Sequence, residues 1–87
     1  MKRDFDPANA RREFWASSDE ALHTRETIAA AIHASVDLME SFAIKGGGPT
    51  FQRLGRRALY RKADVLEWIE RNSQRVDNTA QLKRTAA

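Results

Sequence analysis

The chain has 87 residues, which is enough for one domain with a single small core. It has no cysteine, so neither a disulfide framework nor a thiolate metal site can stabilise it. The first residues are too polar for a signal peptide, and no apolar run reaches the ~18 residues needed to span a bilayer, so we expect a cytoplasmic protein.

The net charge of +3 is distributed unevenly along the chain. Residues 1–44 hold five basic and eight acidic side chains, whereas residues 45–87 hold ten basic and four acidic ones. The second half therefore carries the charge that would attract a polyanion. A membrane surface or an acidic protein would also attract it, but membrane binders usually place their cations on an amphipathic helix. Cations on a hairpin favour nucleic acid.

Residues 1–21 are expected to form a partly helical N-terminal extension. Asp6 followed by Pro7 predicts a helix start, because an aspartate oxygen caps free backbone amides and proline suits the first helical position. The helix should run to about Trp15, which would bring Phe14 and Trp15 to the core.

The N-terminal extension also contains a second capping signal and three large aromatic side chains. The spacing of Ser17 and Glu20 is that of a capping box and predicts a further helical turn. The aromatic residues Phe5, Phe14 and Trp15 either cap the core of a domain too small to be stable without them, or form an adhesive surface for another protein.

Residues 22–73 are expected to form the main domain, which opens with two short helices. Thr24 is the expected N-cap of the first helix, and Glu26 in its first turn favours the positive end of the helix dipole. His33 interrupts the apolar pattern, so this helix should be short, and Ser35 can cap the second one. Apolar residues recur at helical spacing on the inward faces of both helices: Ile28, Ala29, Ile32, Val36, Met39, Phe42 and Ala43.

A hairpin is expected after the glycine-rich break at 46–49, where three glycines and a proline end the second helix. Its strands should cover residues 51–54 and 58–61. The Gly55-Arg56 pair between them suits a two-residue turn that requires a positive φ at its first position.

A last helix is expected from about Lys62 to Asn72, with Asp64 favouring its N-terminal end. Its inward face should consist of four residues, Val65, Leu66, Trp68 and Ile69. Residues 74–87 are polar and rich in small side chains, and we expect a flexible C-terminal tail.

The hairpin carries five cations with no acidic residue between them: Arg53, Arg56, Arg57, Arg61 and Lys62. Each could neutralise a phosphate and release counterions, so the cluster favours a nucleic acid as partner. The alternative is an ordinary solvated hairpin.

Several motifs of the chain occur together in one group of DNA-binding proteins. They are Ser35 at the start of the second helix, GGGP at 46–49, LGRR at 54–57, the pair Tyr60-Arg61, and Asp64 four residues before Trp68. Between Leu22 and Arg71 the chain therefore resembles the MerR-like winged-helix excisionases, also called recombination directionality factors, and related prophage regulators. The resemblance implies an α+β, mainly α fold: a winged helix-turn-helix with a two-stranded wing and a packing C-terminal helix.

The resemblance also implies a function. In this family the second helix enters the major groove of DNA, and the wing follows the backbone into the neighbouring minor groove. Family members bend attachment-site DNA so that an integrase excises a mobile element, and they often bind as several cooperating copies. We therefore expect an architectural excisionase of the nucleoid whose partners are double-stranded DNA, further copies of itself and a site-specific integrase.

Two other functions remain open. The same domain could bind promoter DNA as a transcriptional regulator of a prophage or integrative element. Alternatively, the acidic first half could dock a recombinase or polymerase subunit, which would make the protein an interaction module. Only the last function predicts binding that survives in the absence of DNA.

The second helix departs from the family pattern S-x-R-T-L-x-R-W-R. Its arginine positions are Asp37, Ser41 and Ala43, and Phe42 replaces the tryptophan, which leaves Lys45 as the only cation. Pairing of arginine with guanine is therefore largely lost, although an acid can accept a hydrogen bond from a cytosine amine. We expect sequence preference to come from DNA shape and from repeated, cooperative contacts.

The expected DNA-contacting residues form two sets, and an arginine at the wing tip (Arg56 or Arg57) is expected to enter a narrow minor groove. The wing set is Arg53, Arg56, Arg57, Arg61 and Lys62. The set on the second helix is Ser35, Asp37, Leu38, Ser41 and Lys45, with Thr50 and Tyr60 as second-rank candidates.

No enzymatic site is expected. His23 and His33 lie ten residues apart without a metal-binding spacing, so we expect no metal. No Ser-His-Asp arrangement or catalytic carboxylate pair can be recognised, and the glycine run does not lead from a strand into a helix as a phosphate-binding loop does. We therefore expect no cofactor, no small-molecule ligand and no membrane partner.

Overall fold

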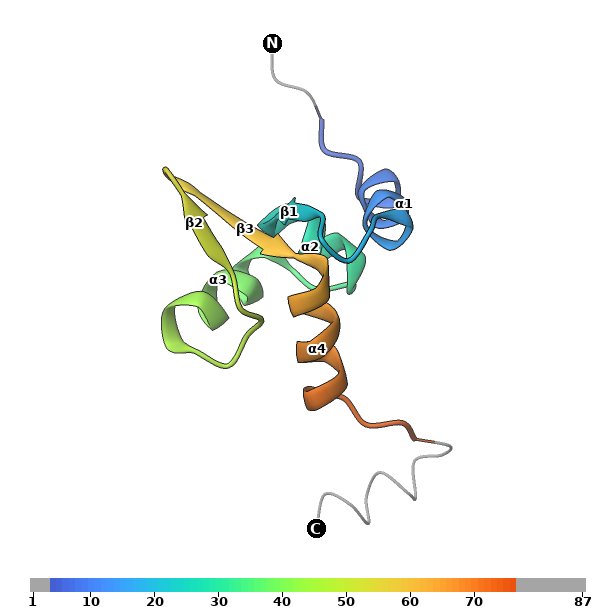
Figure 1. Ribbon diagram of the computed structural model, residues 1–87, viewed down its shortest axis with the longest axis vertical. Coiled ribbons are helices and arrows are strands. Elements are labelled where there is room, and N and C mark those ends of the chain that lie inside the picture. Colours follow the sequence, from blue (N-terminus) through green and yellow to red (C-terminus); the bar gives the residue numbers. More distant parts are fainter. Residues whose placement is uncertain (1–3, 77–87) are drawn as a thin grey trace.

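The computed structural model describes residues 4–76 (Figure 1). Within this part, four helices accompany a three-stranded antiparallel sheet. The elements are α1 (Pro7–Ala16), β1 (Leu22–Thr24), α2 (Arg25–Ala31), α3 (Val36–Lys45), β2 (Gln52–Leu54), β3 (Arg57–Arg61) and α4 (Lys62–Asn72). The predicted α+β class is confirmed, and the expected tail beyond residue 76 lies outside the described residues.

Helix α1 begins as predicted. The carboxylate of Asp6 accepts hydrogen bonds from the backbone amides of Ala8, at 3.1 Å, and Asn9, at 3.3 Å, and Pro7 occupies the first turn. The further helical turn predicted after Ser17 is wrong. Ser17 is instead the C-cap in extended conformation, and a tight turn closed by the amide of Ala21 on the carbonyl of Ser18 leads into the sheet.

Strand β1 was not predicted from the sequence. It has only three residues, which is too short for an alternating pattern, and its last residue, Thr24, is also the N-cap of α2. It pairs with β3, where His23 lies opposite Tyr60, so the strand order is β1-β3-β2. The central strand β3 therefore connects the N-terminal part of the chain to the hairpin.

Helices α2 and α3 have the predicted caps. The Thr24 hydroxyl accepts from the amide of Thr27 at 3.3 Å, and the Ser35 hydroxyl accepts from that of Leu38 at 3.1 Å. Between the helices, His33 adopts a φ of 60°, a left-handed conformation that helps the chain turn within residues 32–35. Among residues 4–76, no single helix is long and apolar enough to cross a membrane; α2 and α3 meet the criteria only as a pair bent by 114°.

The hairpin of residues 52–61 forms as predicted, with each strand boundary within one residue of the expected one. Leu54 pairs with Arg57 around a two-residue turn in which Gly55 has a φ of 65°. Positive φ at the first turn residue alone is the pattern of a type II′ turn, which matches the strand twist. Before the hairpin, Gly46 ends α3 with a φ of 91°.

One core joins all parts of the described chain. Its buried members are Phe14, Ile28, Ala29, Ala31, Met39, Tyr60 and Val65, with Ile32, Val36, Phe42, Phe51, Ala58 and Ile69 packed around them. Phe14 is fully buried, so of the two roles open to it, core packing is the one observed. Trp15 is 47% exposed but donates its indole hydrogen to the carbonyl of Ala31, whereas Phe5 stays 46% exposed at the chain entry.

Helix α4 has the predicted bounds. Val65 is fully buried, and Trp68 ties the helix to the glycine-rich break by donating from Nε1 to the carbonyl of Gly47 at 2.7 Å. The Trp68 ring also meets Phe42 of α3 edge-on, with the ring centroids 5.6 Å apart. These contacts hold α3 against α4 below the hairpin (Figure 1).

Candidate nucleic-acid interface

The hairpin turn places Arg56 between the ends of β2 and β3, at a tip that projects away from the helices (Figure 1). Arg53, Arg56 and Arg57 are exposed, and within residues 4–76 none of the three forms an ion pair. Leu54, opposite Arg57, is 65% exposed. Three of the five predicted wing cations therefore end in solvent.

Arg61 is partly engaged within the fold. It donates to the carboxylate of Glu20 at 2.8 Å, across the turn that precedes β1, and its side chain is 36% exposed. A pair of this exposure contributes about 0–1 kcal/mol to stability. A phosphate could therefore replace Glu20 at small cost, so Arg61 can still contribute charge to the hairpin.

Lys62 does not lie on the hairpin surface, where it was expected from the sequence. It is the first residue of α4, is 7% exposed, and donates from Nζ to the carbonyls of Ser17, at 2.7 Å, and Trp15, at 3.2 Å. These carbonyls belong to the end of α1, where helix carbonyls lack partners and a cation is favoured. The Lys62 ammonium also lies 5.7 Å from the Phe14 ring centroid.

The outward face of α3 contains most of the second predicted set. Asp37 and Lys45 are exposed, Leu38 is 46% exposed, and Ser41 is partly buried. Ser35 is occupied in its backbone cap, so its hydroxyl is directed at the helix itself rather than outward. Four of these five side chains can thus reach a partner in front of α3.

Ile44 is an exposed residue of α3 that the sequence analysis did not select. Its side chain is 84% exposed, on the same face as Asp37, seven residues earlier, and next to Glu40. The inward apolar stripe of α3 runs through Met39 and omits position 44, which is the signal that could have identified it. The face is therefore apolar and acidic rather than basic.

A groove separates α3 from the hairpin, with the start of α2 at its floor. It is lined by four arginines and two glutamates together with smaller residues: Thr24, Arg25, Glu26, Val36, Glu40, Arg53, Arg56, Arg57 and Ala58. Register explains the position of Arg53: it pairs with Ala58, so both face the core side of the hairpin. The groove therefore has a net positive lining.

Arg25 is the groove residue with the most defined surroundings. Its Nε donates to the Tyr60 hydroxyl at 3.0 Å, and its guanidinium carbon lies 5.3 Å from the centroid of the Phe51 ring and 5.8 Å from that of Tyr60. Tyr60 is 1% exposed, so this second-rank candidate faces the core and holds Arg25, whereas the other one, Thr50, is exposed. No local sequence pattern pairs Arg25 with a tyrosine 35 residues away.

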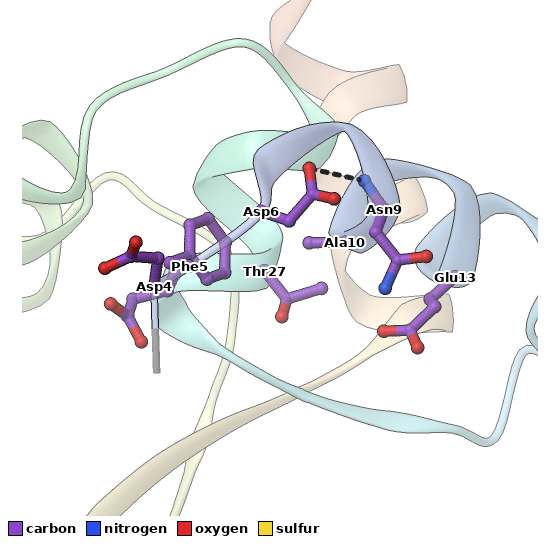
Figure 2. A pocket seen from close by; sticks show the side chains of 8 residues that line it. Asp4, Phe5, Asp6, Asn9, Ala10, Glu13 and Thr27 are labelled. Carbon is purple, nitrogen blue, oxygen red and sulfur yellow. Dashed lines mark hydrogen bonds between the residues drawn. The ribbon is translucent and has the colours of Figure 1, made fainter. Parts of the chain in front are cut away.

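A second hollow lies between α1 and the start of α2 and has the opposite charge. Figure 2 shows Asp4, Phe5, Asp6 and Glu13 around it, and Glu26 also lines it. The dashed contact there is the Asp6 cap to the Asn9 amide. Because its carboxylates repel phosphates, this hollow does not belong to the nucleic-acid interface.

His23 occupies the junction of α1, β1 and α4. Its Nε2 lies 3.0 Å from the Ser17 hydroxyl, and its ring centroid is 4.9 Å from that of Phe14. Burial lowers the pKa of His23 below its ordinary value, the nearby Lys62 cation lowers it further, and Glu13 acts in the opposite direction. The imidazole is therefore held in its neutral form at neutral pH.

Comparisons of the chain with protein-family models, with curated proteins and with solved structures found no match. Within residues 4–76, no group of three His, Cys, Asp or Glu side chains is placed to hold a metal ion. Any function assigned to the interface must therefore be argued from its charge, its exposure and its geometry.

Proposed function

We propose that this protein binds double-stranded DNA with a winged helix-turn-helix and acts as an architectural excisionase. The observation that carries the proposal is the hairpin, on which Arg53, Arg56 and Arg57 are exposed without an acidic partner in the described chain. Each can neutralise a phosphate, and counterion release would supply much of the affinity.

The order of the elements supports a winged helix-turn-helix. Two helices joined by a four-residue connection are followed by a hairpin with a two-residue turn, and β1 pairs with the inner strand of that hairpin. In this arrangement α3 would enter the major groove, and the hairpin beside it would act as the wing. The groove between them would then receive one strand of the DNA backbone.

The outward face of α3 suits a restricted type of base contact. Asp37 can accept a hydrogen bond from a cytosine amine, Ser41 can contact several bases, and Ile44 offers an apolar surface for a thymine methyl group. Arginine–guanine pairs are missing from this face. Sequence preference would therefore depend on DNA shape and on the wing tip, where Arg56 or Arg57 can enter a narrow minor groove.

The excisionase role comes from the motif resemblance between Leu22 and Arg71. A small domain with few base contacts would bind weakly as a single copy, so specificity would require several copies side by side on bent DNA, together with an integrase. The same contacts would serve a transcriptional regulator of a prophage or integrative element. In either case the protein would act in the cytoplasm, at the nucleoid.

The test is to capture sheared genomic DNA of the host with the protein and to sequence the fragments retained at moderate salt. Closely spaced enrichment at the attachment site of a mobile element would support the excisionase. Enrichment only upstream of genes would support the regulator. The variant Arg56→Ala with Arg57→Ala should retain no fragments, whereas Arg12→Ala with Arg75→Ala, which removes the same charge from exposed sites off the hairpin, should retain them.

A second candidate function is favoured by the surface of α3. Leu38 and Ile44 are 46% and 84% exposed, and the acidic Asp37 and Glu40 lie among them. Such a surface suits a basic, partly apolar protein partner such as a recombinase or polymerase subunit. This interaction module would capture its partner after nuclease treatment, and it would retain no specific DNA fragment.

A further inference from the structure

Arg25 stands where the helical part of the domain meets the hairpin. It is the first residue of α2 and lines the same groove as Arg53. Its position follows from the fold: β1 ends at Thr24, and the pairing of β1 with β3 brings the start of α2 next to Tyr60. Arg25 therefore lies on the floor of the basic groove, although it is far from the hairpin in sequence.

The Arg25 side chain is held in one orientation. Its Nε is used by the Tyr60 hydroxyl at 3.0 Å, and the guanidinium lies over the rings of Phe51 and Tyr60. A guanidinium has five N–H donors, so the hydrogens of its two terminal nitrogens remain for another acceptor. Holding the fork in place before binding reduces the rotamer entropy that binding would otherwise cost.

The acceptor is not a carboxylate of the described chain. Glu26 and Glu40 line the same groove, yet the ion pairs within residues 4–76 involve neither of them and do not include Arg25. With four arginines against two glutamates, the groove retains a net positive lining. A phosphate can accept two parallel hydrogen bonds, one from each terminal nitrogen of a guanidinium.

We propose that Arg25 binds a backbone phosphate of DNA, with Tyr60 and Phe51 as the residues that position it. The proposal rests on the DNA-binding function above and adds a contact on the helical side of the groove. Arg25 at the floor of the groove and Arg53 on the hairpin would then contact the same strand. This contact would fix the depth at which α3 enters the major groove.

The test measures how binding to a fluorescent, mixed-sequence duplex depends on salt, by fluorescence anisotropy. In Arg25→Gln the slope of log K against log salt should become shallower by about 0.9, which corresponds to one lost phosphate. Arg12→Gln, which removes the same charge from an exposed site on α1, should keep the wild-type slope. Tyr60→Phe leaves the charge of Arg25 in place but removes the hydroxyl that positions it. The salt slope should therefore stay at the wild-type value while the affinity for the duplex falls about two- to tenfold.

A purely structural Arg25 would leave the slope unchanged, and a wild-type slope in folded Arg25→Gln would overturn the proposal. Should Arg25→Gln not fold, the wild-type protein supplies the measurement: the Arg25 Nε–Hε NMR signal, assigned with Arg25→Lys, should shift when the duplex is added. An unshifted signal at saturating duplex would overturn the proposal as well.

The two proposals fail in different ways. If the wild-type protein binds no duplex at low salt, the proposed DNA-binding function is wrong, and the proposed role of Arg25 is wrong as well. If the wild-type protein binds the duplex and folded Arg25→Gln keeps the wild-type salt slope, the proposed function stands and the inference about Arg25 is wrong.

Discussion

Basic side chains have opposite roles on the hairpin and on the side of the molecule around α1. On the hairpin, Arg53, Arg56 and Arg57 end in solvent. Around α1, Arg11 donates to the carbonyl of Ala30 at 2.9 Å, and Lys62 is buried against the carbonyls that end α1. The difference shows that a cation is engaged where carbonyls at a helix end lie within reach and stays exposed at the hairpin tip, where no such carbonyls are near.

The largest expected effect concerns the exposed arginines at the hairpin tip. Arg56→Ala with Arg57→Ala removes two charges from the hairpin tip, so DNA bending should be abolished and the salt slope should become shallower by about 1.8. Bending can be measured by energy transfer between dyes at the two ends of a duplex. The paired control Arg12→Ala with Arg75→Ala should bend DNA like wild type; an unchanged tip variant would refute the wing mechanism.

The next effect concerns Lys62, whose ammonium group is hydrogen-bonded within the fold. Lys62→Met keeps most of the stem but removes the hydrogen bonds to Trp15 and Ser17, so the free energy of unfolding should fall by about 2–3 kcal/mol in a urea titration. Lys45→Met, at the exposed end of α3, should cost less than about 1 kcal/mol. If folded Lys62→Met also showed a shallower slope of log K against log salt, the distinction between the buried Lys62 and the exposed hairpin arginines would be lost.

A smaller effect is expected on α3. Asp37→Ala removes an exposed acid that would repel phosphates, so affinity for a mixed-sequence duplex should rise about two- to fivefold. Glu70→Ala, which removes the same charge from an exposed site on α4, provides the control. Should Asp37→Ala weaken binding instead, the carboxylate would be making a contact to a base, and the loss should be confined to duplexes with a cytosine at one position.

The smallest effect is a pH dependence of stability. The folded protein holds the pKa of His23 below its ordinary value, so the unfolded chain binds more protons as pH falls. The stabilisation is fully present above about pH 6.5 and is lost as the pH falls through the lowered pKa. His23→Gln should therefore flatten the fall in Tm between pH 7 and pH 5.

Features set by near neighbours could be predicted from the sequence. The caps at Asp6, Thr24 and Ser35 use amides two or three residues away, and the turn at Gly55 depends on one φ angle. The hairpin and its exposed arginines followed from the same local rules. The α+β class was correct for this reason.

Features set by distant partners could not be predicted. Lys62 has the same local signals as the hairpin arginines, and only the return of α1 to the start of α4 buries it. The stacked Arg25 depends on a tyrosine 35 residues away in the sequence, and β1 exists only because β3 offers a free edge. Ile44 is a partial exception, since its place off the inward stripe of α3 was visible in the helical period.

The contacts of Lys62 have a consequence for how the chain acquires its structure. They join residues 45 and 47 positions apart, and β1 likewise has no partner until β3 exists. During synthesis, the contacts of α1 with Lys62 and the pairing of β1 therefore form only after the hairpin and the start of α4 have left the ribosome. Long loops must close before these contacts can form, which slows folding but makes it cooperative. A nascent chain that stops before residue 62 would lack the Lys62 contacts that hold the end of α1.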